Sequence, residues 1–154
     1  MLKRFSFALS ALLCCLLLPL RVAADSPPAT KSWAYIVMDA DTGQVLVEKN
    51  ADQKAFPASI TKVLTAALAL ESCAPEETFV MSEEAVFSLE QGATHIALSP
   101  GESVSVEQML YATMLASAND AANGLAEHAG GSISAFVERM NAQARVLGAQ
   151  DTHF

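Results

Sequence analysis

Ser59 and Lys62, three residues apart, have the residue types and spacing of a nucleophile with its own base. One turn of helix would place the lysine amine beside the serine hydroxyl. The start of a helix favours negative charge, and the Ser59 amide lies where it can donate to an oxyanion. Burial beneath an apolar helix would lower the pKa of the lysine and suit it to act as a base. Alone the pair is weak, because Ser-x-x-Lys arises by chance about once in such a chain, and a capping serine with a solvated lysine is the ordinary interpretation.

A second motif, Ser117-Ala118-Asn119, falls where one expected helix ends and the next begins. A hydroxyl and an amide at such a junction can both project into a cleft, although serine and asparagine are also ordinary caps there. A serine able to pass a proton and an asparagine able to orient a lysine or hold a substrate amide are what a Ser-Lys acyl-transfer site still requires. The two motifs together therefore indicate more than either one alone.

The histidines are weaker candidates. They have no metal-ligand spacing and no second ligand nearby in sequence, so ordinary surface or core positions are favoured for His95, His128 and His153. The acids Asp39, Asp41 and the pair Glu83-Glu84 would suit a two-carboxylate glycosidase, but acids in turns and at helix starts are routine.

The elements that must position the two motifs follow from the apolar pattern. Residues 33–39 and 44–48 alternate and are rich in β-formers, and Asp41-Thr42-Gly43 between them predicts an antiparallel hairpin. Pro57 fixes the backbone just ahead of a helix over residues 60–71. That helix is apolar nearly all round, so we expect it to be buried.

The remaining expected elements are short segments and three further helices. Residues 78–81 and 95–98 are extended candidates, and Ser82 is expected to cap a brief helix through Phe87. Ser105 and Gln108 form a capping box for a helix that stops near Ser117. A helix over residues 120–129 ends at Gly130-Gly131, and Ser132 opens the last helix, which Gly148 closes.

The N-terminus has the pattern of an export signal. Basic residues precede the apolar run 5–20, and the small residues Val22-Ala23-Ala24 stand before Asp25. We therefore predict a signal peptide over residues 1–24, cleaved after Ala24, and a linker over residues 25–32. The apolar run is shorter than the roughly 20 residues that a membrane-spanning helix needs, so an uncleaved anchor is the less favoured alternative.

Composition bounds the function further. The 154 residues carry a net charge of −8, and cleavage would remove three basic residues and no acid. An acidic exported chain of at most one domain argues against nucleic-acid binding, which depends on neutralising phosphates. Cys14 and Cys15 leave with the signal, so Cys73 alone can form neither an intrachain disulfide nor a cysteine metal cluster.

The stretch from Phe56 to Thr65, preceded by Asp39 to Leu46, resembles the first motif region of the serine-type D-alanyl-D-alanine carboxypeptidases, the low-molecular-mass penicillin-binding proteins. Pro100-Gly101-Glu102 and the stretch from Leu110 to Ala122 resemble their second motif region. The similarity continues in order to residue 154 and covers essentially all of the mature chain. It outweighs the ordinary interpretation of Ser59.

The resemblance implies an α/β penicillin-recognising serine enzyme fold, β-lactamase/transpeptidase-like, present here as an N-terminal β-hairpin and a mostly helical region. It implies an enzyme that removes the terminal D-alanine from peptidoglycan stem peptides and is acylated by penicillin. By this resemblance Ser59 is the nucleophile, Lys62 its base, Ser117 a proton relay toward the leaving amine, and Asn119 a ligand to the substrate and to Lys62. The identity of the acylation base is disputed in the related β-lactamases. No metal or organic cofactor is implied.

One part of the family pattern is missing. The third motif, Lys-Thr-Gly, does not occur, since neither Lys49, Lys54 nor Lys62 is followed by Thr-Gly. We therefore expect residues 33–154 to be the N-terminal portion of a truncated catalytic domain, whose hairpin would keep an unsatisfied edge. Expressed alone, such a portion would be inactive or would aggregate.

The sequence leaves several functions open. A D,D-endopeptidase or a β-lactamase lies close to the carboxypeptidase, although no Glu has the spacing of the deacylating base of a class A β-lactamase. An inactive envelope module that binds peptidoglycan is a second class, and a purely structural helical protein is a third. The expected partners are stem peptides and β-lactams, in the cell envelope outside the cytoplasm; membrane association stays open.

Overall fold

The computed structural model describes residues 29–154, and the signal peptide predicted for residues 1–24 lies outside the described residues. Residues 29–32 of the predicted linker have no regular structure. The chain divides into two compact units, of which the first ends at Lys54 and the second runs from Ala55 to Phe154. Each unit is described by itself.

The described part of the first unit is the predicted β-hairpin. Strand β1 (Tyr35–Met38) pairs antiparallel with β2 (Val45–Lys49), with Tyr35 opposite Lys49. In the turn, an Asp39 carboxylate oxygen accepts from the Thr42 hydroxyl at 2.6 Å and the Thr42 amide at 2.8 Å. These hydrogen bonds, the hydroxyl's first, lower the pKa of Asp39. Asp39 is therefore a turn residue.

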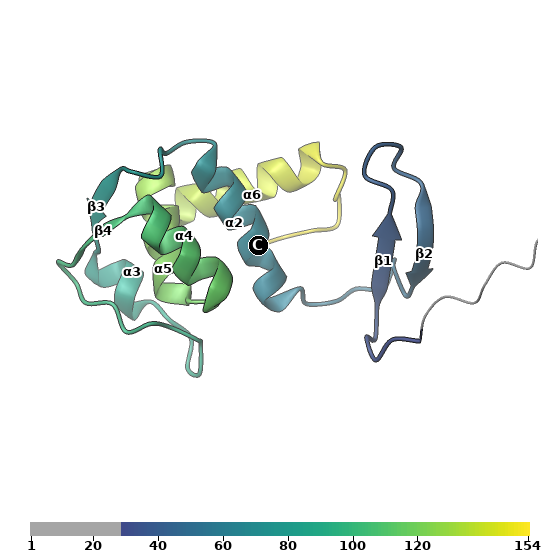
Figure 1. Ribbon diagram of the computed structural model, residues 1–154, viewed down its shortest axis with the longest axis horizontal. Coiled ribbons are helices and arrows are strands. Elements are labelled where there is room, and N and C mark those ends of the chain that lie inside the picture. Colours follow the sequence, from purple (N-terminus) through teal and green to yellow (C-terminus); the bar gives the residue numbers. More distant parts are fainter. Residues whose placement is uncertain (1–28) are drawn as a thin grey trace, which may run out of the picture. The chain divides into compact units, whose positions relative to one another are not determined.

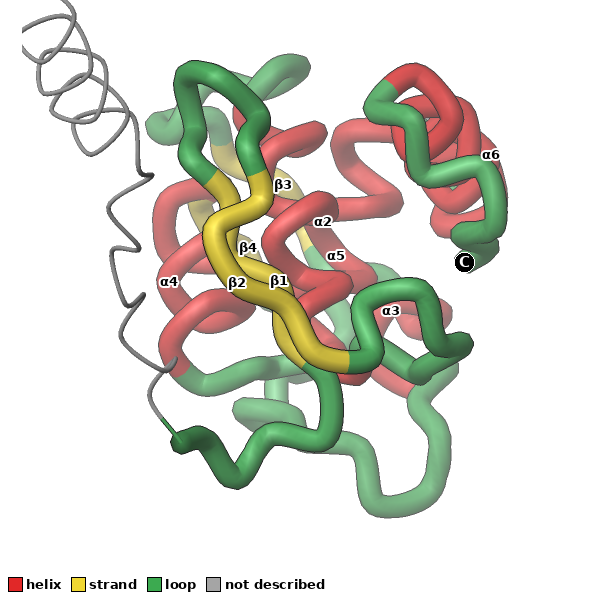
Figure 2. Tube along the Cα trace, turned by 90° about the vertical axis from the view of Figure 1, so that its right-hand side faces the viewer, coloured by secondary structure: helices red, strands yellow, loops and turns green. Residues whose placement is uncertain are grey.

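The second unit is mostly helical (Figures 1 and 2). A 3-10 turn, η1 (Ala58–Ile60), leads into α2 (Thr61–Leu70), and α4 (Val106–Leu115), α5 (Asn119–Gly130) and α6 (Ile133–Val146) complete the bundle. Helix α5 contacts α2, α4, α6 and the short helix α3 (Glu83–Phe87), so it is the central element of this unit. Its core includes the fully buried side chains of Leu68, Met81, Val106, Leu125 and Phe136.

A small second sheet flanks the helices. Strand β3 (Thr78–Val80) pairs antiparallel with β4 (Ser103–Ser105), and α3 (Glu83–Phe87) follows β3. The predicted strand over residues 95–98 is wrong: this segment is irregular. The backbone N–H groups of Ile96 and Leu98 donate to the Asp120 carboxylate, so they are not available to a strand partner.

The predicted helix boundaries are largely confirmed. Ser82 caps α3 by accepting from the Ala85 amide, and Ser105 and Gln108 form the capping box of α4. Helix α5 ends at Gly131, whose φ of +77° is a left-handed conformation suited to glycine. Ser132 then caps α6.

The prediction that the helix after Pro57 is buried is confirmed for one side of the helix and wrong for the other. Ile60 is 73% exposed and Val63 is 56% exposed, whereas Leu68 is 1% exposed. Helices α4, α5 and α6 contact α2 in this unit, and they cover one side of it. Within residues 29–154, no helix is both long enough and apolar enough to cross a membrane.

Candidate active site

Ser59 lies in the 3-10 turn that leads into α2, and its hydroxyl caps no helix. Its Oγ lies 2.6 Å from the Oγ of Ser117, which is in the break between α4 and α5. Two serines that are 58 residues apart in sequence therefore share a hydrogen bond. The contact favours a chemical role for Ser59 over the capping role that its sequence position alone suggests.

The backbone is strained at Ser117 and at the residue that precedes Ser59. Ala58, directly before Ser59, has a φ of +49°, and Ser117 has a φ of +55°. A residue with a Cβ in this left-handed region costs roughly 1–2 kcal/mol. Strain of this kind persists where the surrounding structure fixes a functional geometry. Here it is located at the two positions that bring the hydroxyls together.

Lys62 lies in the first turn of α2 and is only 8% exposed. Its Nζ donates a hydrogen bond of 2.9 Å to the Oδ1 of Asn119. Burial lowers the pKa of Lys62, because the charged amine loses its hydration. The pKa shift has the direction that the sequence predicts. In the described part of the chain the amine is bonded to Asn119, and no hydrogen bond joins it to the Ser59 hydroxyl.

Asn119 is held by both ends of its side-chain amide. Its backbone N–H and its Nδ2 both donate to the Thr94 carbonyl, at 2.8 and 2.9 Å. A carbonyl only accepts, so this contact requires the side-chain nitrogen to face Thr94 and the oxygen to face Lys62. The backbone carbonyl of Thr94 thus fixes the orientation in which Asn119 meets the lysine.

The Thr94 segment is in turn anchored by Asp120, which is 1% exposed. Its carboxylate accepts from the N–H groups of Ile96 at 3.3 Å, Leu98 at 3.0 Å and Ala121 at 2.9 Å. Sequence reasoning missed this role, although Asp120 stands directly after the second motif. The signal was an acid beside an asparagine at a predicted helix start, which is also an ordinary pattern.

A cleft of about 530 Å³ lies at these residues. Its polar lining includes Ser59, Lys62 and Asn119, and α6 contributes apolar side chains such as Phe136. This volume is within the usual range for small-molecule sites. Glu90 also lines the cleft, a carboxylate that sequence spacing did not single out.

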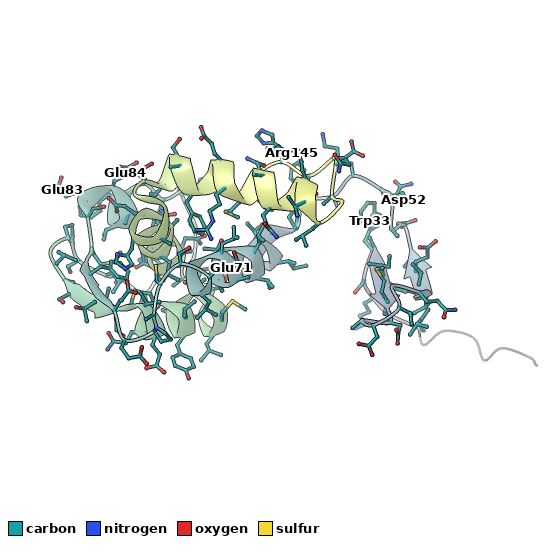
Figure 3. All side chains as sticks on the ribbon, turned by 90° about the horizontal axis from the view of Figure 1, so that it is seen from above. Trp33, Asp52, Glu71, Glu83, Glu84 and Arg145 are labelled. Carbon is teal, nitrogen blue, oxygen red and sulfur yellow. The ribbon has the colours of Figure 1, made fainter. Side chains whose placement is uncertain are left out.

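Several candidates from the sequence lie elsewhere. Glu83 and Glu84 project outward from α3, as Figure 3 shows, and both are exposed. His95 and His153 are exposed and do not line the cleft. The structure thus brings the Ser59–Lys62 motif and the Ser117–Asn119 motif together and leaves these acids and histidines outside the cleft.

The chain is similar to known proteins. A family model described as D-alanyl-D-alanine carboxypeptidase, Peptidase_S11, matches residues 21–154. The D-alanyl-D-alanine carboxypeptidase DacF of Bacillus subtilis is 36% identical over 129 residues, which are 82% of this chain and 33% of the relative. DacB2 of Mycobacterium tuberculosis is 38% identical over 129 residues, which are 84% of this chain and 42% of that relative.

Solved structures agree with the sequence comparison. The crystal structure of the D-alanyl-D-alanine carboxypeptidase DacD from Francisella tularensis matches with a TM-score of 0.76 and 30% identity, over 92% of this chain and 35% of that chain. The match confirms the predicted fold class, over part of the solved structure. The chain spans between 33% and 42% of the length of these relatives. Since the family model takes in both motifs and every described residue, the chain belongs to the D-alanyl-D-alanine carboxypeptidase family, Peptidase_S11.

Proposed function

We propose that the protein is an exported serine D,D-carboxypeptidase that removes the terminal D-alanine from peptidoglycan stem peptides and is acylated by penicillin. The observation that carries the proposal is the pair of hydrogen bonds that join the two motifs, Ser59 to Ser117 and Lys62 to Asn119. A single motif match would place a serine beside a lysine. The hydrogen bonds to Ser117 and Asn119 add the proton relay and the orienting amide that acyl transfer needs.

The geometry supports a role for each side chain. Lys62, whose pKa is lowered, accepts the Ser59 proton as Oγ attacks the carbonyl carbon of the penultimate D-alanine. The Ser117 hydroxyl, 2.6 Å from Ser59 Oγ, gives its proton to the nitrogen of the departing D-alanine and is reprotonated by Lys62, so the proton taken from Ser59 ends on the leaving amine. The C–N bond breaks and a Ser59 ester remains, which water hydrolyses to free the serine.

Asn119 has capacity for both of its proposed roles. Its Oδ1 accepts from Lys62 and one proton of Nδ2 is bonded to Thr94. An amide nitrogen carries two protons, so one remains to donate to a substrate carbonyl. Holding the lysine and contacting the substrate are therefore compatible for this side chain.

Labelling of the full gene product with fluorescent penicillin tests the proposal. The parent is expected to form a covalent adduct and to release D-alanine from a D-Ala-D-Ala peptide, and Ser59→Ala is expected to do neither. Ser88→Ala is the control, since Ser88 is exposed and lies outside the cleft. A parent that binds peptidoglycan but forms no adduct would instead support the envelope-module function.

One observation favours a second candidate, β-lactam hydrolysis. Glu90 lines the same cleft as Ser59, and a carboxylate near an acyl-enzyme can activate the attacking water. In that case the penicillin adduct would turn over, and Glu90→Gln would lengthen its lifetime. If the penicillin adduct of the parent is long-lived and the parent releases D-alanine from a D-Ala-D-Ala peptide, the result supports the carboxypeptidase function over β-lactam hydrolysis.

A further inference from the structure

Three residues of types that ligate transition metals meet on the second unit, away from the cleft. The ligand atoms of Cys73, Glu77 and His128 all lie within 4.8 Å of one another. Cys73 follows the end of α2, Glu77 precedes β3, and His128 is in the last turns of α5. Cys73 and Glu77 are close in sequence, and the fold brings them to His128, which is 51 residues from Glu77.

Each of the two polar ligands is already oriented. One carboxylate oxygen of Glu77 accepts from the Ala74 amide at 2.7 Å, which leaves the other oxygen 3.2 Å from His128 Nε2. The His128 ring stacks on Phe79, with ring centroids 4.6 Å apart and an angle of 9° between the planes. Contacts that fix a ligand's direction are typical of metal sites.

We propose that Cys73, Glu77 and His128 bind a zinc ion with a water molecule as the fourth ligand. A thiolate, an imidazole and a carboxylate are a donor set that zinc accepts. This set is softer than the all-oxygen sets that bind calcium or magnesium. The thiolate and the carboxylate together balance the two charges of the ion. On binding, the Cys73 thiol releases its proton to solvent.

Access and local charge are compatible with an ion. The side chains of His128 and Glu77 are 25% and 46% exposed, so the ion can enter from solvent, while Cys73 is 8% exposed. The nearby Arg139 is bonded to Ser72 and lies 3.3 Å from Glu71, which offsets its charge. The ordinary alternative is a surface His-Glu pair beside a free cysteine that packs in the hydrophobic core, and a measurement of metal binding distinguishes the two.

The position indicates a structural ion. Helix α2 has ten residues, so at 1.5 Å per residue the cluster lies about 15 Å along the helix from the Ser59 end. The ion would join the C-terminal ends of two helices. Its ligand Cys73 follows the end of α2, and its ligand His128 is in the last turns of α5. It would thus fix the packing of the two helices whose first turns carry Lys62 and Asn119.

Cobalt spectroscopy and zinc calorimetry on the full gene product, reduced and stripped of metal, test the proposal. The parent is expected to bind one ion and to show the near-ultraviolet charge-transfer band of a cobalt–thiolate bond. Cys73→Ser is expected to lose that band. His128→Gln and Glu77→Gln are expected to weaken zinc binding at least about tenfold. The matched controls His153→Gln and Glu76→Gln, at exposed positions outside the cluster, are expected to bind as the parent does.

A parent with no thiolate band, or a band that persists in Cys73→Ser, would overturn the proposal. Since Cys73 is buried, a second measurement avoids that substitution: zinc is expected to raise the Tm of the parent but not that of His128→Gln, and an equal rise in both would also overturn it. Penicillin labelling of these variants keeps the two proposals separate, because Ser59 acylation does not require the cluster's ligands.

Discussion

Asp120→Asn tests whether residues 94–98 hold the side-chain amide of Asn119 in place. One Asp120 oxygen accepts from Leu98 at 3.0 Å and the other from Ala121 at 2.9 Å, and both contact the Ile96 amide at 3.3 Å. Asparagine has the same size but only one acceptor oxygen. In either orientation its NH₂ group faces a backbone donor that loses its partner.

The expected loss of stability follows from that mismatch. A buried donor left without a partner costs roughly 1–3 kcal/mol, and Asp120 is 1% exposed, so water cannot readily replace the lost bond. We expect Asp120→Asn to lower the free energy of unfolding by about 2 kcal/mol, since one strong hydrogen bond to a charged group is lost and others weaken.

The same substitution is expected to slow acylation by penicillin. Thr94 orients Asn119, and Asn119 holds Lys62, so displacement of residues 94–98 moves the lysine. A misplacement of about 1 Å in a reacting group costs on the order of a hundredfold in rate. Urea denaturation measures the first effect, and the rate of labelling of the folded protein measures the second.

Glu102→Gln is the matched control, because Glu102 also accepts a backbone N–H, from Ser99 at 3.0 Å, but is exposed. It is expected to change the unfolding free energy by less than about 0.5 kcal/mol, as exposed substitutions usually do. If Asp120→Asn behaves like this control in both assays, the reasoning that the buried carboxylate positions the site is refuted.

Lys62→Met is expected to abolish labelling and to raise stability at neutral pH, because it removes a buried amine whose pKa is lowered by burial. Between that lowered pKa and the ordinary value of 10.5, the unfolded chain binds more protons than the folded one, so the parent gains stability as pH rises. Thermal melts should therefore show the difference in Tm between variant and parent narrowing from pH 7 to alkaline pH. A difference that widens would contradict the assignment. Gly130→Ala would place a Cβ 2.7 Å from the Phe136 Cβ and 3.0 Å from its backbone. Overpacking typically costs roughly 1–3 kcal/mol, so urea denaturation should show a loss of that order, and unchanged stability would mean that α6 shifts freely.

The sequence predicted the helices well where local chemistry fixes their ends. Ser82, Ser105 and Ser132 cap α3, α4 and α6 as their spacing indicates, because a cap depends on residues within one turn. Strand β4 was missed, since three residues of Ser-Val-Ser have no periodicity of their own. It exists because β3 pairs with it.

The candidate site was predictable in its residue types and not in its connections. Ser59, Lys62, Ser117 and Asn119 were identified from two motifs and a family resemblance, and the structure brings all four together. The supporting contact of Asn119 is to the backbone of Thr94. Any residue has a backbone carbonyl, so the side-chain pattern could not reveal this partner.

The two site-bearing helices run in the same direction. Lys62 in the first turn of α2 contacts Asn119 at the start of α5, while Cys73 beyond the end of α2 lies near His128 in the last turns of α5. Their N-termini therefore both face the cleft, and each carries a partial positive charge. Two such ends favour an oxyanion or a substrate carboxylate in the cleft. The parallel pairing of α2 and α5 thus supports the proposed acyl transfer, in which negative charge develops beside Ser59.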